Sequence, residues 1–447
     1  MSDEQTAPRR LPRQIGKYKV LGRLGEGATS EVFHARDEFR GRDVAIKCVQ
    51  VPERAGDSDD GHYFQRFFAA EADLVGRLEH PNVVQIFDAV DDAETPYVVM
   101  EYVPGTTLKR FCRPDSLLSL EQIVEIGFKC AMALGYVARQ GLIHRDVKPA
   151  NVLAVMDRDT VVDVKITDFG SVLQLDAERT AVHRVGSLAY ISPEQLDGGQ
   201  IDARADMYSL AAVLYHLIAG RPPFEGPTQA ALMHQVFNQQ PPPLAGFRDG
   251  VPASLEALLM RALEKEPADR PANWDEFAQS LAGVIARREV PRGKLQGVLD
   301  SERFSLLRNL DFFSAFGDVE LWEVVHRAKW QRFSFGHALY KKGQEGRNFY
   351  IVASGGVEVF REGAKVAVLG KGATVGEMAY LAPNPALRVH QADVLVAQTC
   401  TTICFNPEAM AQLSVSTRHR FDDAFIKVLV RRLHAAHETL DHPRRIL

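Results

Sequence analysis

Two short polar segments constrain this chain more than any other feature of its sequence. The first reads HRDVKPAN over residues 144–151, and the second reads DFG over residues 168–170. They supply two carboxylates and one amide, Asp146, Asn151 and Asp168, in a fixed order. An Asp can orient and deprotonate an attacking hydroxyl, while an Asn and a second Asp can hold Mg²⁺ beside a triphosphate. Together the two segments predict phosphoryl transfer.

A glycine-rich turn upstream suits the same chemistry. Residues 24–32, LGEGATSEV, are typical of a strand, a tight turn and a second strand. Gly25 and Gly27 lie in the turn, where the missing Cβ lets the backbone approach phosphates closely. Such a turn alone is a weak signal, since many surface hairpins contain one, and it gains weight only from the strand after it.

The next strand carries a single lysine among apolar residues. It is expected over residues 44–47, VAIK, and it places Lys47 behind the glycine turn. A lone lysine there could be a side chain that reaches out to water, but in this context a role as ligand of the α- and β-phosphates explains it better. Glu71, on a helix expected over residues 64–78 with one apolar face, is the carboxylate expected to hold Lys47.

Taken together, these segments resemble those of a known protein family. Residues 15–285 are similar to a eukaryotic-type (Hanks-type) protein kinase, close to the bacterial serine/threonine kinases. Small departures, such as Ser30 at the usual third glycine and Ser192 in place of the usual Ala, remove no catalytic group. The resemblance extends to the HPN turn at 80–82, the gatekeeper and hinge at 100–103, the SPE segment at 192–194, the loop anchor Asp206, and Arg270, which usually pairs with Glu194.

The resemblance implies ATP and Mg²⁺ as cofactors and assigns roles to individual residues. Asp146 would be the catalytic base, supported by Lys148, with Lys47 and Glu71 completing the catalytic set, and Asn151 and Asp168 would bind the metal. Lys148 beside a short hydroxyl is typical of kinases that act on Ser and Thr of proteins. The residues expected to contact the cofactor are Leu24, Gly25, Gly27, Val32, Ala45, Lys47, Glu101, Val103 and Asn151.

Arg145 directly precedes the catalytic Asp, which in this family often signals control by phosphorylation of the activation segment. A phosphate there would pair with Arg and order the segment. Thr180, in the middle of that segment, is the candidate phosphorylation site, whereas Ser187 is expected to bond the Asp146–Lys148 pair. The alternative is that Thr180 is an ordinary solvated loop residue.

Composition and charge agree with a cytoplasmic enzyme of several domains. The chain has 447 residues and a net charge of −5, which favours neither nucleic acid nor an anionic membrane as a partner. Residues 1–14 are polar and are expected to form a disordered tail, not a signal peptide. No apolar run approaches the roughly 20 residues that a membrane span needs.

The kinase-like pattern ends near residue 285, and residues 286–300 are expected to form a linker. This stretch is basic and contains Pro291 and Gly293. The alternative is a pseudosubstrate over residues 287–290 that lacks its hydroxyl, but basic linkers are common.

A second domain is expected over residues 301–440. An amphipathic helix pair over 304–325 precedes short strands separated by glycine turns, a pattern typical of a small barrel or jelly roll. The strands are expected at 330–335, 338–341, 349–353, 357–361 and 366–369. Their glycine pattern, with GEMA at 376–379, resembles the cyclic nucleotide-binding domain. The expected fold class is therefore α+β: a bilobal kinase fold followed by a small β-roll or jelly-roll domain with flanking helices.

The ligand of the second domain is less clear than its fold. In that family the backbone after Gly376 would face a cyclic phosphate, and Glu377 would accept from the ribose 2′-hydroxyl. An Arg that pairs with the phosphate normally follows a Pro, but here Ala386 follows Pro385 and the nearest Arg is Arg388. Cyclic AMP or cyclic GMP is thus one possible effector. The alternative is a cassette that binds no nucleotide, in a domain that docks protein.

A final helix is expected over residues 418–440, before a short tail at 441–447. Its apolar stripe consists of Phe421, Phe425, Val428, Leu429, Leu433 and Leu440. In the family such a helix caps the ligand or mediates dimerisation, so a homodimer is one expectation, and simple packing on the barrel is the other. The sequence as a whole favours a serine/threonine kinase tuned by a C-terminal module over a catalytically silent scaffold.

Overall fold

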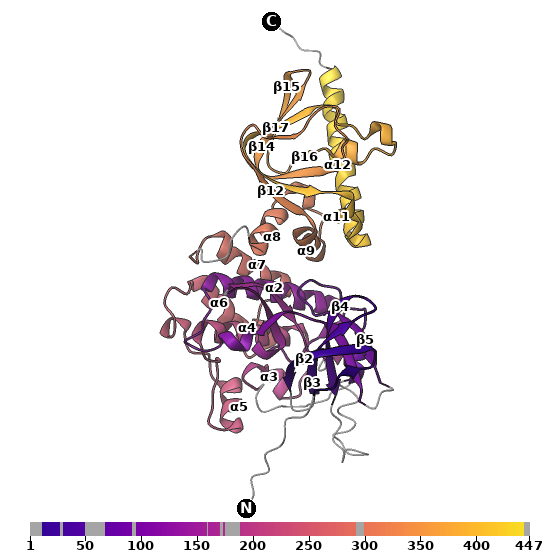
Figure 1. Ribbon diagram of the computed structural model, residues 1–447. Coiled ribbons are helices and arrows are strands. Elements are labelled where there is room, and N and C mark those ends of the chain that lie inside the picture. Colours follow the sequence, from indigo (N-terminus) through magenta and orange to yellow (C-terminus); the bar gives the residue numbers. More distant parts are fainter. Residues whose placement is uncertain are drawn as a thin grey trace, which may run out of the picture. The chain divides into compact units, whose positions relative to one another are not determined.

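The computed structural model describes residues 11–26, 30–49, 68–91, 95–158, 160–169, 173–174, 188–291 and 299–441. The chain divides into two compact units, Met1–Gly297 and Val298–Leu447 (Figure 1). Within the described residues, no helix combines the length and the apolar character that crossing a bilayer requires. The expected cytoplasmic location stays a prediction.

The first unit begins with a six-stranded antiparallel sheet in the order β1-β2-β3-β4-β6-β5. Alternate residues of its strands, among them Phe33, Ile46 and Val99, form a buried core on one face. The strands are β1 (Gln14–Ile15), β2 (Tyr18–Glu26), β3 (Ser30–Asp37), β4 (Arg42–Val49), β5 (Ile86–Val90) and β6 (Tyr97–Glu101). The expected glycine hairpin is therefore β2–β3, and the strand that carries Lys47 is β4.

The helix expected over residues 64–78 is shorter at its C-terminal end than the sequence pattern suggested. Among the described residues, 68–72 are helical and 73–77 form turns. Gly76 adopts a left-handed conformation (φ +69°), and its N–H donates to the carbonyl of Ile86 instead of continuing the helix. Leu74 and Leu78 are nevertheless buried. The spacing of the apolar residues therefore marked which side chains are buried, although the helix does not continue to them.

The remainder of the first unit is mainly helical and surrounds the long helix α2 (Leu120–Arg139). Two glycines let neighbouring helices approach α2: a Cβ on Gly127 would lie 2.8 Å from Leu214, and one on Gly135 would lie 2.9 Å from Trp274. The other helices are α3 (Pro193–Leu196), α4 (Ala203–Ala219), α5 (Gln229–Asn238), α6 (Ala253–Ala262) and α7 (Trp274–Ala286), with short 3-10 turns η1 (Leu108–Phe111), η2 (Pro149–Asn151), η4 (Leu188–Tyr190), η5 (Leu244–Gly246) and η6 (Pro267–Asp269).

Short strands flank the polar segments that carry the chemistry. A three-stranded sheet has the order β10-β9-β7, and β11 pairs with β8. Their bounds are β7 (Gly105–Thr107), β8 (Leu142–Ile143), β9 (Val152–Asp157), β10 (Thr160–Ile166) and β11 (Leu173–Gln174). Residues 144–151 thus lie between β8 and β9, and Asp168 follows β10.

The start of the expected linker is packed against the first unit. Arg288 has a left-handed conformation, the N–H of Glu289 donates to the carbonyl of Val284, and the Glu289 carboxylate accepts from Ser254. Val290 is buried. Residues 287–290 therefore cap the C-terminal end of α7. Because they are packed there, the pseudosubstrate alternative is disfavoured.

The second unit is a β-roll with helices before and after it. Its sheet has the order β12-β17-β14-β15, with β13 on β17 and β16 on β14. The strands are β12 (Lys329–Phe333), β13 (Ala338–Tyr340), β14 (Phe349–Arg361), β15 (Ala364–Leu369), β16 (Thr374–Val375) and β17 (Asp393–Phe405). The helices are α8 (Asp300–Arg308), η7 (Asp311–Phe313), α9 (Asp318–Arg327), α10 (Glu377–Tyr380), η8 (Pro385–Leu387), α11 (Pro407–Ala411) and α12 (Val415–Asp441).

The strands of this unit differ from the expected ones in two respects. The strands expected at 349–353 and 357–361 form one long strand, β14, with register shifts around Gly355. Gly355 has φ +80°, and a Cβ there would lie 2.4 Å from the carbonyl oxygen of Thr399, so the irregularity requires glycine. The sequence analysis also missed β17, the central partner of β14.

Aromatic rings join α12 to the β-roll. Phe421 packs on Phe405 with ring centroids 4.9 Å apart, and Phe425 packs on Phe349 at 5.0 Å. Beyond these contacts the expected apolar stripe does not pack on the barrel: Leu429 and Leu433 face solvent, as do Ile426 and Val430. The helix continues past its aromatic contacts, which explains the difference.

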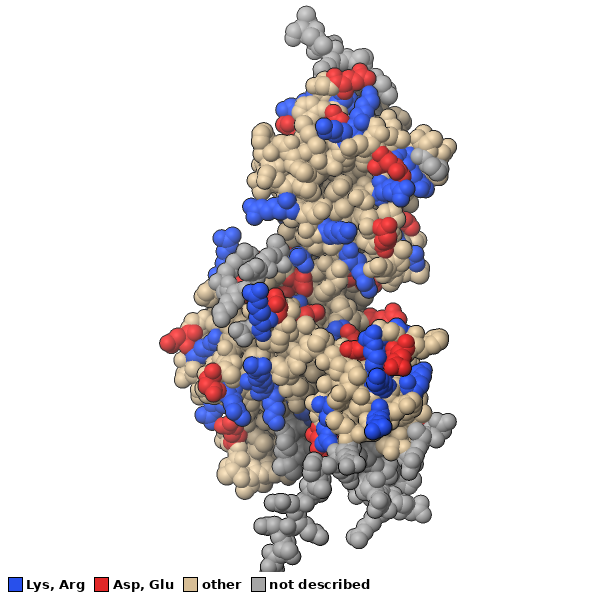
Figure 2. Space-filling model, viewed as in Figure 1, with Lys and Arg blue, Asp and Glu red and all other residues tan. Residues whose placement is uncertain are grey.

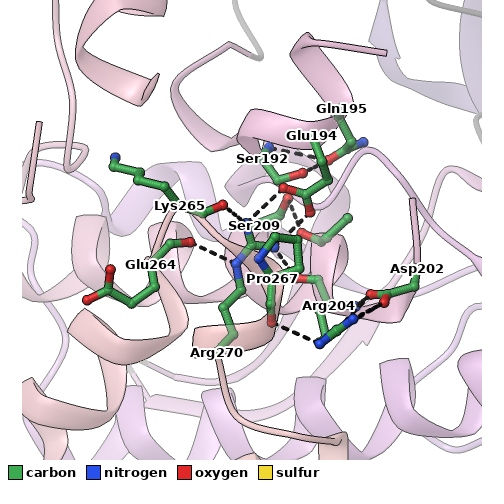
Figure 3. Close-up of polar contacts among 11 residues, drawn as sticks. Ser192, Glu194, Gln195, Asp202, Arg204, Ser209, Glu264, Lys265, Pro267 and Arg270 are labelled. Atoms are coloured by element: carbon green, nitrogen blue, oxygen red, sulfur yellow. Dashed lines mark hydrogen bonds and ion pairs between the residues drawn. The ribbon is translucent and has the colours of Figure 1, made fainter. Parts of the chain in front are cut away.

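A buried arginine fixes the end of the activation segment in the first unit (Figure 3). Arg270 is 1% exposed and makes two parallel bonds to Glu194, of 2.7 and 2.8 Å, as expected from the sequence. Its other N–H contacts reach the carbonyls of Glu264, Arg204 and Lys265, at 2.9, 3.0 and 3.0 Å. Because every N–H direction of the guanidinium has an acceptor, the buried charge is compensated.

We predict that Arg270→Met destabilises the first unit by about 3–5 kcal/mol, because it leaves the Glu194 carboxylate without its partner. Scanning calorimetry of the full chain should show one transition lowered by roughly 5–10 °C. The matched control is Arg204→Ala, which removes a half-exposed pair with Asp202 and should cost about 1 kcal/mol or less. Equal losses in the two variants would contradict the account.

Candidate active site and ligand cassette

A buried carboxylate holds the catalytic loop in place. Asp206 on α4 accepts hydrogen bonds from the backbone N–H of His144 at 2.7 Å and of Arg145 at 2.8 Å. Arg145 has φ +67°, a conformation that costs a non-glycine residue about 1 kcal/mol or more. Burial raises the pKa of Asp206, while His144 and the two amides oppose that shift. The anchoring role expected of Asp206 is confirmed.

His144 connects the loop to the segment that carries Asp168. Its ring is fully buried, Nδ1 accepts from the N–H of Asp146 at 3.3 Å, and Nε2 lies 3.0 Å from the carbonyl of Thr167. Because Nδ1 is the acceptor, Nε2 carries the proton that is donated to Thr167. The ring also packs against Phe169, with centroids 4.7 Å apart.

The carboxylate of Asp146 is oriented by two neighbours. Lys148 Nζ donates to both of its oxygens, at 2.9 and 2.6 Å. Asn151 Nδ2 donates to the carbonyl of Asp146 at 2.9 Å and to its Oδ2 at 3.0 Å. Since the nitrogen of the Asn151 amide is used in this way, its oxygen is the atom left to face a cation.

Lys47 joins three segments that are far apart in the sequence. Its Nζ lies 2.7 Å from Glu71 Oε1 and 2.5 Å from Asp168 Oδ1. Burial disfavours the charge on Lys47, but the two carboxylates outweigh it and raise its pKa. Burial likewise opposes ionisation of Asp168, and Lys47 overcomes it and lowers the pKa of Asp168 to about 2. Lys47 and Asp168 are therefore both charged near neutral pH.

The donor set suits a magnesium ion. Mg²⁺ prefers hard oxygen ligands, and the amide oxygen of Asn151 and the ionised carboxylate of Asp168 are of this type. The segments that carry these two residues are tied together by a hydrogen bond of 2.9 Å from the N–H of Thr167 to the carbonyl of Asn151. Asp168 has φ +66°, an unusual backbone conformation typical of functional positions.

Apart from Asn151, which precedes β9, the described residues expected to bind the nucleotide lie on the first sheet and the segment after it. Gly25 on β2 pairs with Val32 on β3, and Ala45 is buried on β4. Leu24 is 48% exposed, and Val103 follows β6. The Glu101 side chain accepts from Lys165 at 3.0 Å and from the N–H of Gln85 at 3.3 Å, so its carboxylate is already engaged by other groups of the chain.

Four residues named in the sequence analysis, Gly27, Thr180, Ser187 and Gly293, lie outside the described residues.

Sequence reasoning missed two groups that support the site. Gln195, directly after the SPE segment, donates from Nε2 to the carbonyl of Arg145 at 3.0 Å. Asn82 donates to Asp163 Oδ1 at 2.8 Å, and Lys129 pairs with the same oxygen at 3.0 Å. This second group ties the turn after the Glu71 helix to β10. The HPN segment signalled the turn, but nothing in the sequence indicated its partners.

In the second unit, the start of the cassette has the expected backbone shape. Gly376 has φ +84° and caps α10, and a Cβ there would lie 2.8 Å from the carbonyl of Asn348. Glu377 is 1% exposed, and its carboxylate pairs with Arg432 of α12. Burial raises the pKa of Glu377, and Arg432 opposes the shift. Arg432 is a residue that the sequence analysis did not consider.

The third residue expected in the cassette is Arg388, which lies between η8 and β17. Arg388 is exposed, and its Nε donates to the carbonyl of Ala382 at 3.0 Å. The nearby His390 is buried and stacked on Tyr340 with ring centroids 3.7 Å apart. Gly376 and Glu377 thus form the start of α10, while the Nε of Arg388 is directed to a backbone carbonyl.

Charged side chains of both signs are mixed over the surface. On the face drawn in Figure 2, Lys and Arg lie among Asp and Glu over both units, which agrees with the net charge of −5.

Comparison with known proteins agrees with this geometry. The family model for the protein kinase domain matches residues 18–281, and the model for the cyclic nucleotide-binding domain matches residues 330–416. A probable serine/threonine-protein kinase of Streptomyces coelicolor is 36% identical over 297 residues, which cover 64% of this chain and 43% of the relative. The serine/threonine-protein kinase PknB of Mycobacterium leprae is 35% identical over 305 residues, with coverages of 66% and 47%.

The matched region spans less than half the length of these two curated relatives. The kinase match itself covers more than half of this chain. The chain therefore belongs to the protein kinase family, and in it a cyclic nucleotide-binding domain follows the kinase domain.

Proposed function

We propose that this chain is an ATP- and Mg²⁺-dependent serine/threonine protein kinase. The observation that carries the proposal is the position of Lys47 between Glu71 and Asp168, at 2.7 and 2.5 Å. This arrangement joins a strand, a helix and the segment after β10, and it is the geometry that a phosphate-binding lysine needs. The names of the curated relatives support the same activity.

Each residue of the site has a part in the proposed reaction. Asp146, oriented by Lys148 and Asn151, accepts the proton of the attacking hydroxyl. Lys47 binds phosphate oxygens, and Lys148 balances charge beside the hydroxyl. Bound Mg²⁺, held by Asn151 and Asp168, supplies neutralisation of the phosphate charge. Since no group of this set is missing or displaced, the catalytically silent scaffold is disfavoured.

We predict that Lys47→Met and Asp168→Ala each lower phosphoryl transfer by about a thousandfold or more, because charge neutralisation supplies most of the rate. The measurement is transfer of labelled phosphate from ATP to the chain itself and to a generic basic protein. Lys19→Met is the matched control, since Lys19 is an exposed lysine on β2 whose partner is Glu38. Near-wild-type transfer by a folded Lys47→Met or Asp168→Ala variant would show that the assignment is wrong.

We also propose that phosphorylation of Thr180 activates the kinase. Arg145, the expected partner of that phosphate, is held on both sides: Asp206 accepts from its N–H, and Gln195 donates to its carbonyl. A receptor with a fixed backbone suits recognition of a phosphate of about two negative charges.

Thr180→Ala should therefore lower the specific activity at least about tenfold, because the segment loses the charge pair that orders it. Mass spectrometry after incubation with Mg·ATP should find phosphate on Thr180, and the Lys47→Met variant should lack it. A fully active chain without phosphate at this position would contradict the proposal.

For the second unit we propose self-association through α12. Ile426, Val430 and Leu433 are 60%, 47% and 58% exposed and recur at a spacing that places them on one face of the helix. A continuous exposed apolar stripe of this kind suits a helix–helix contact with a second copy of the chain. Docking of another protein on the same stripe is the alternative.

Leu433→Glu should then shift the chain from dimer to monomer in analytical ultracentrifugation, since it places a charge in the helix contact. The control is Phe39→Glu, which alters an exposed apolar residue of the first unit. A wild-type chain that sediments as a monomer at every concentration tested would instead favour docking of another protein.

A further inference from the structure

Arg432 binds the cassette of the second unit through three polar contacts. Its Nη1 pairs with the carboxylate of Glu377, and its Nη2 donates to the carbonyl of Thr374 at 2.7 Å and to the Thr374 hydroxyl at 3.2 Å. Arg432 comes from α12, whereas Thr374 and Glu377 come from β16 and α10. These contacts, named here the Arg432 latch, tie the C-terminal half of α12 to the cassette.

The latch engages one oxygen, Oε1, of the carboxylate that a cyclic nucleotide would contact. In the related domains a ribose hydroxyl is expected to meet the Glu at this position, and here a guanidinium meets it. Glu377 is 1% exposed, so removal of Arg432 would leave a buried carboxylate without its cation. Hydrogen bonds to charged groups are among the strong ones, which gives the latch enough energy to hold one end of a helix.

The phosphate side of the cassette does not fit a cyclic nucleotide. Arg388 is exposed and bonded to the carbonyl of Ala382. The buried His390 fills the space beside two glycines: a Cβ on Gly346 would lie 2.8 Å from its ring, and one on Gly376 would lie 3.4 Å from it. Burial lowers the pKa of His390, so its imidazole is neutral near pH 7 and supplies no charge to a phosphate.

We infer that Arg432 closes the C-terminal helix on the cassette in place of a cyclic nucleotide. The second unit then holds α12 in its docked position through its own side chain, and cyclic AMP or cyclic GMP is not its effector. A ligand can shift a conformational equilibrium only if it binds one state better, and a helix already docked by Arg432 leaves a nucleotide little to gain. The latch does not depend on the kinase activity proposed for the first unit.

Hydrogen–deuterium exchange of the full chain tests the latch directly. In Arg432→Ala, amides of residues 428–441 should exchange at least about tenfold faster than in the wild type, because one charged contact of this kind is worth more than a factor of ten. Residues 415–427, held by Phe421 and Phe425, serve as the internal reference. Arg431→Ala is the matched control, since the neighbouring Arg431 pairs with the exposed Asp311.

Two further variants keep the test decisive if Arg432→Ala fails to fold. Arg432→Lys keeps the charge and loses the fork that reaches both Glu377 and Thr374, so it should give an intermediate increase in exchange. Glu377→Gln keeps the shape and loses the charge, and it should accelerate exchange of the same amides. If exchange in these variants were no faster than in Arg431→Ala, the latch would be refuted.

Cyclic nucleotide is the second arm of the experiment. Within the described residues, Oε2 of Glu377 has no hydrogen-bond partner, so it is the atom that a ribose hydroxyl would have to reach. Millimolar cyclic AMP or cyclic GMP should leave exchange in residues 374–391 and 428–441 of the wild type unchanged. Saturable protection of either segment by either nucleotide would overturn the inference.

Discussion

The ion pairs of Lys47 with Glu71 and Asp168 are the interaction on which the rest of the site depends. A cation between two carboxylates can be stable away from bulk water only if its distances are short, and both are. Three segments must therefore be held at fixed positions: β4, the helix of residues 68–72 and the turn after β10. Much of the polar structure of the first unit serves this purpose.

Other buried charged groups, farther from Lys47, also hold segments of the site in position. Asp206 fixes the loop that carries Asp146, and Arg270 with Glu194 fixes the end of the activation segment. Gln195 connects these two elements through the carbonyl of Arg145. Since Asp206, Arg270 and Gln195 are buried and each has its partner, loss of one leaves a charge or a dipole unsatisfied rather than merely removing a contact. The same groups therefore stabilise the first unit and position its catalytic loop.

How much the sequence predicted depended on whether a residue belonged to a recognisable local pattern. Lys47 with Glu71 and Arg270 with Glu194 were anticipated, because each partner lies in a segment of known role. Gln195, Asp163 and Arg432 were missed, since their roles arise only when the fold brings distant segments together. The helix ending was misjudged because Leu74 and Leu78 keep a helical spacing although Gly76 turns the chain. In the cassette, Glu377 was identified, but its partner lies on α12 and Arg388 points to a backbone carbonyl.

We propose that this site transfers phosphate to aliphatic hydroxyls of proteins. The most direct measurement is phosphoamino acid analysis of a protein mixture treated with the purified chain and labelled ATP, with and without Mg²⁺. We predict phosphoserine and phosphothreonine that form only when Mg²⁺ is present, because the paired Lys148 and Asp146 suit a short aliphatic hydroxyl as the attacking group. Phosphotyrosine as the main product, or no incorporation by a folded chain that binds ATP, would contradict it.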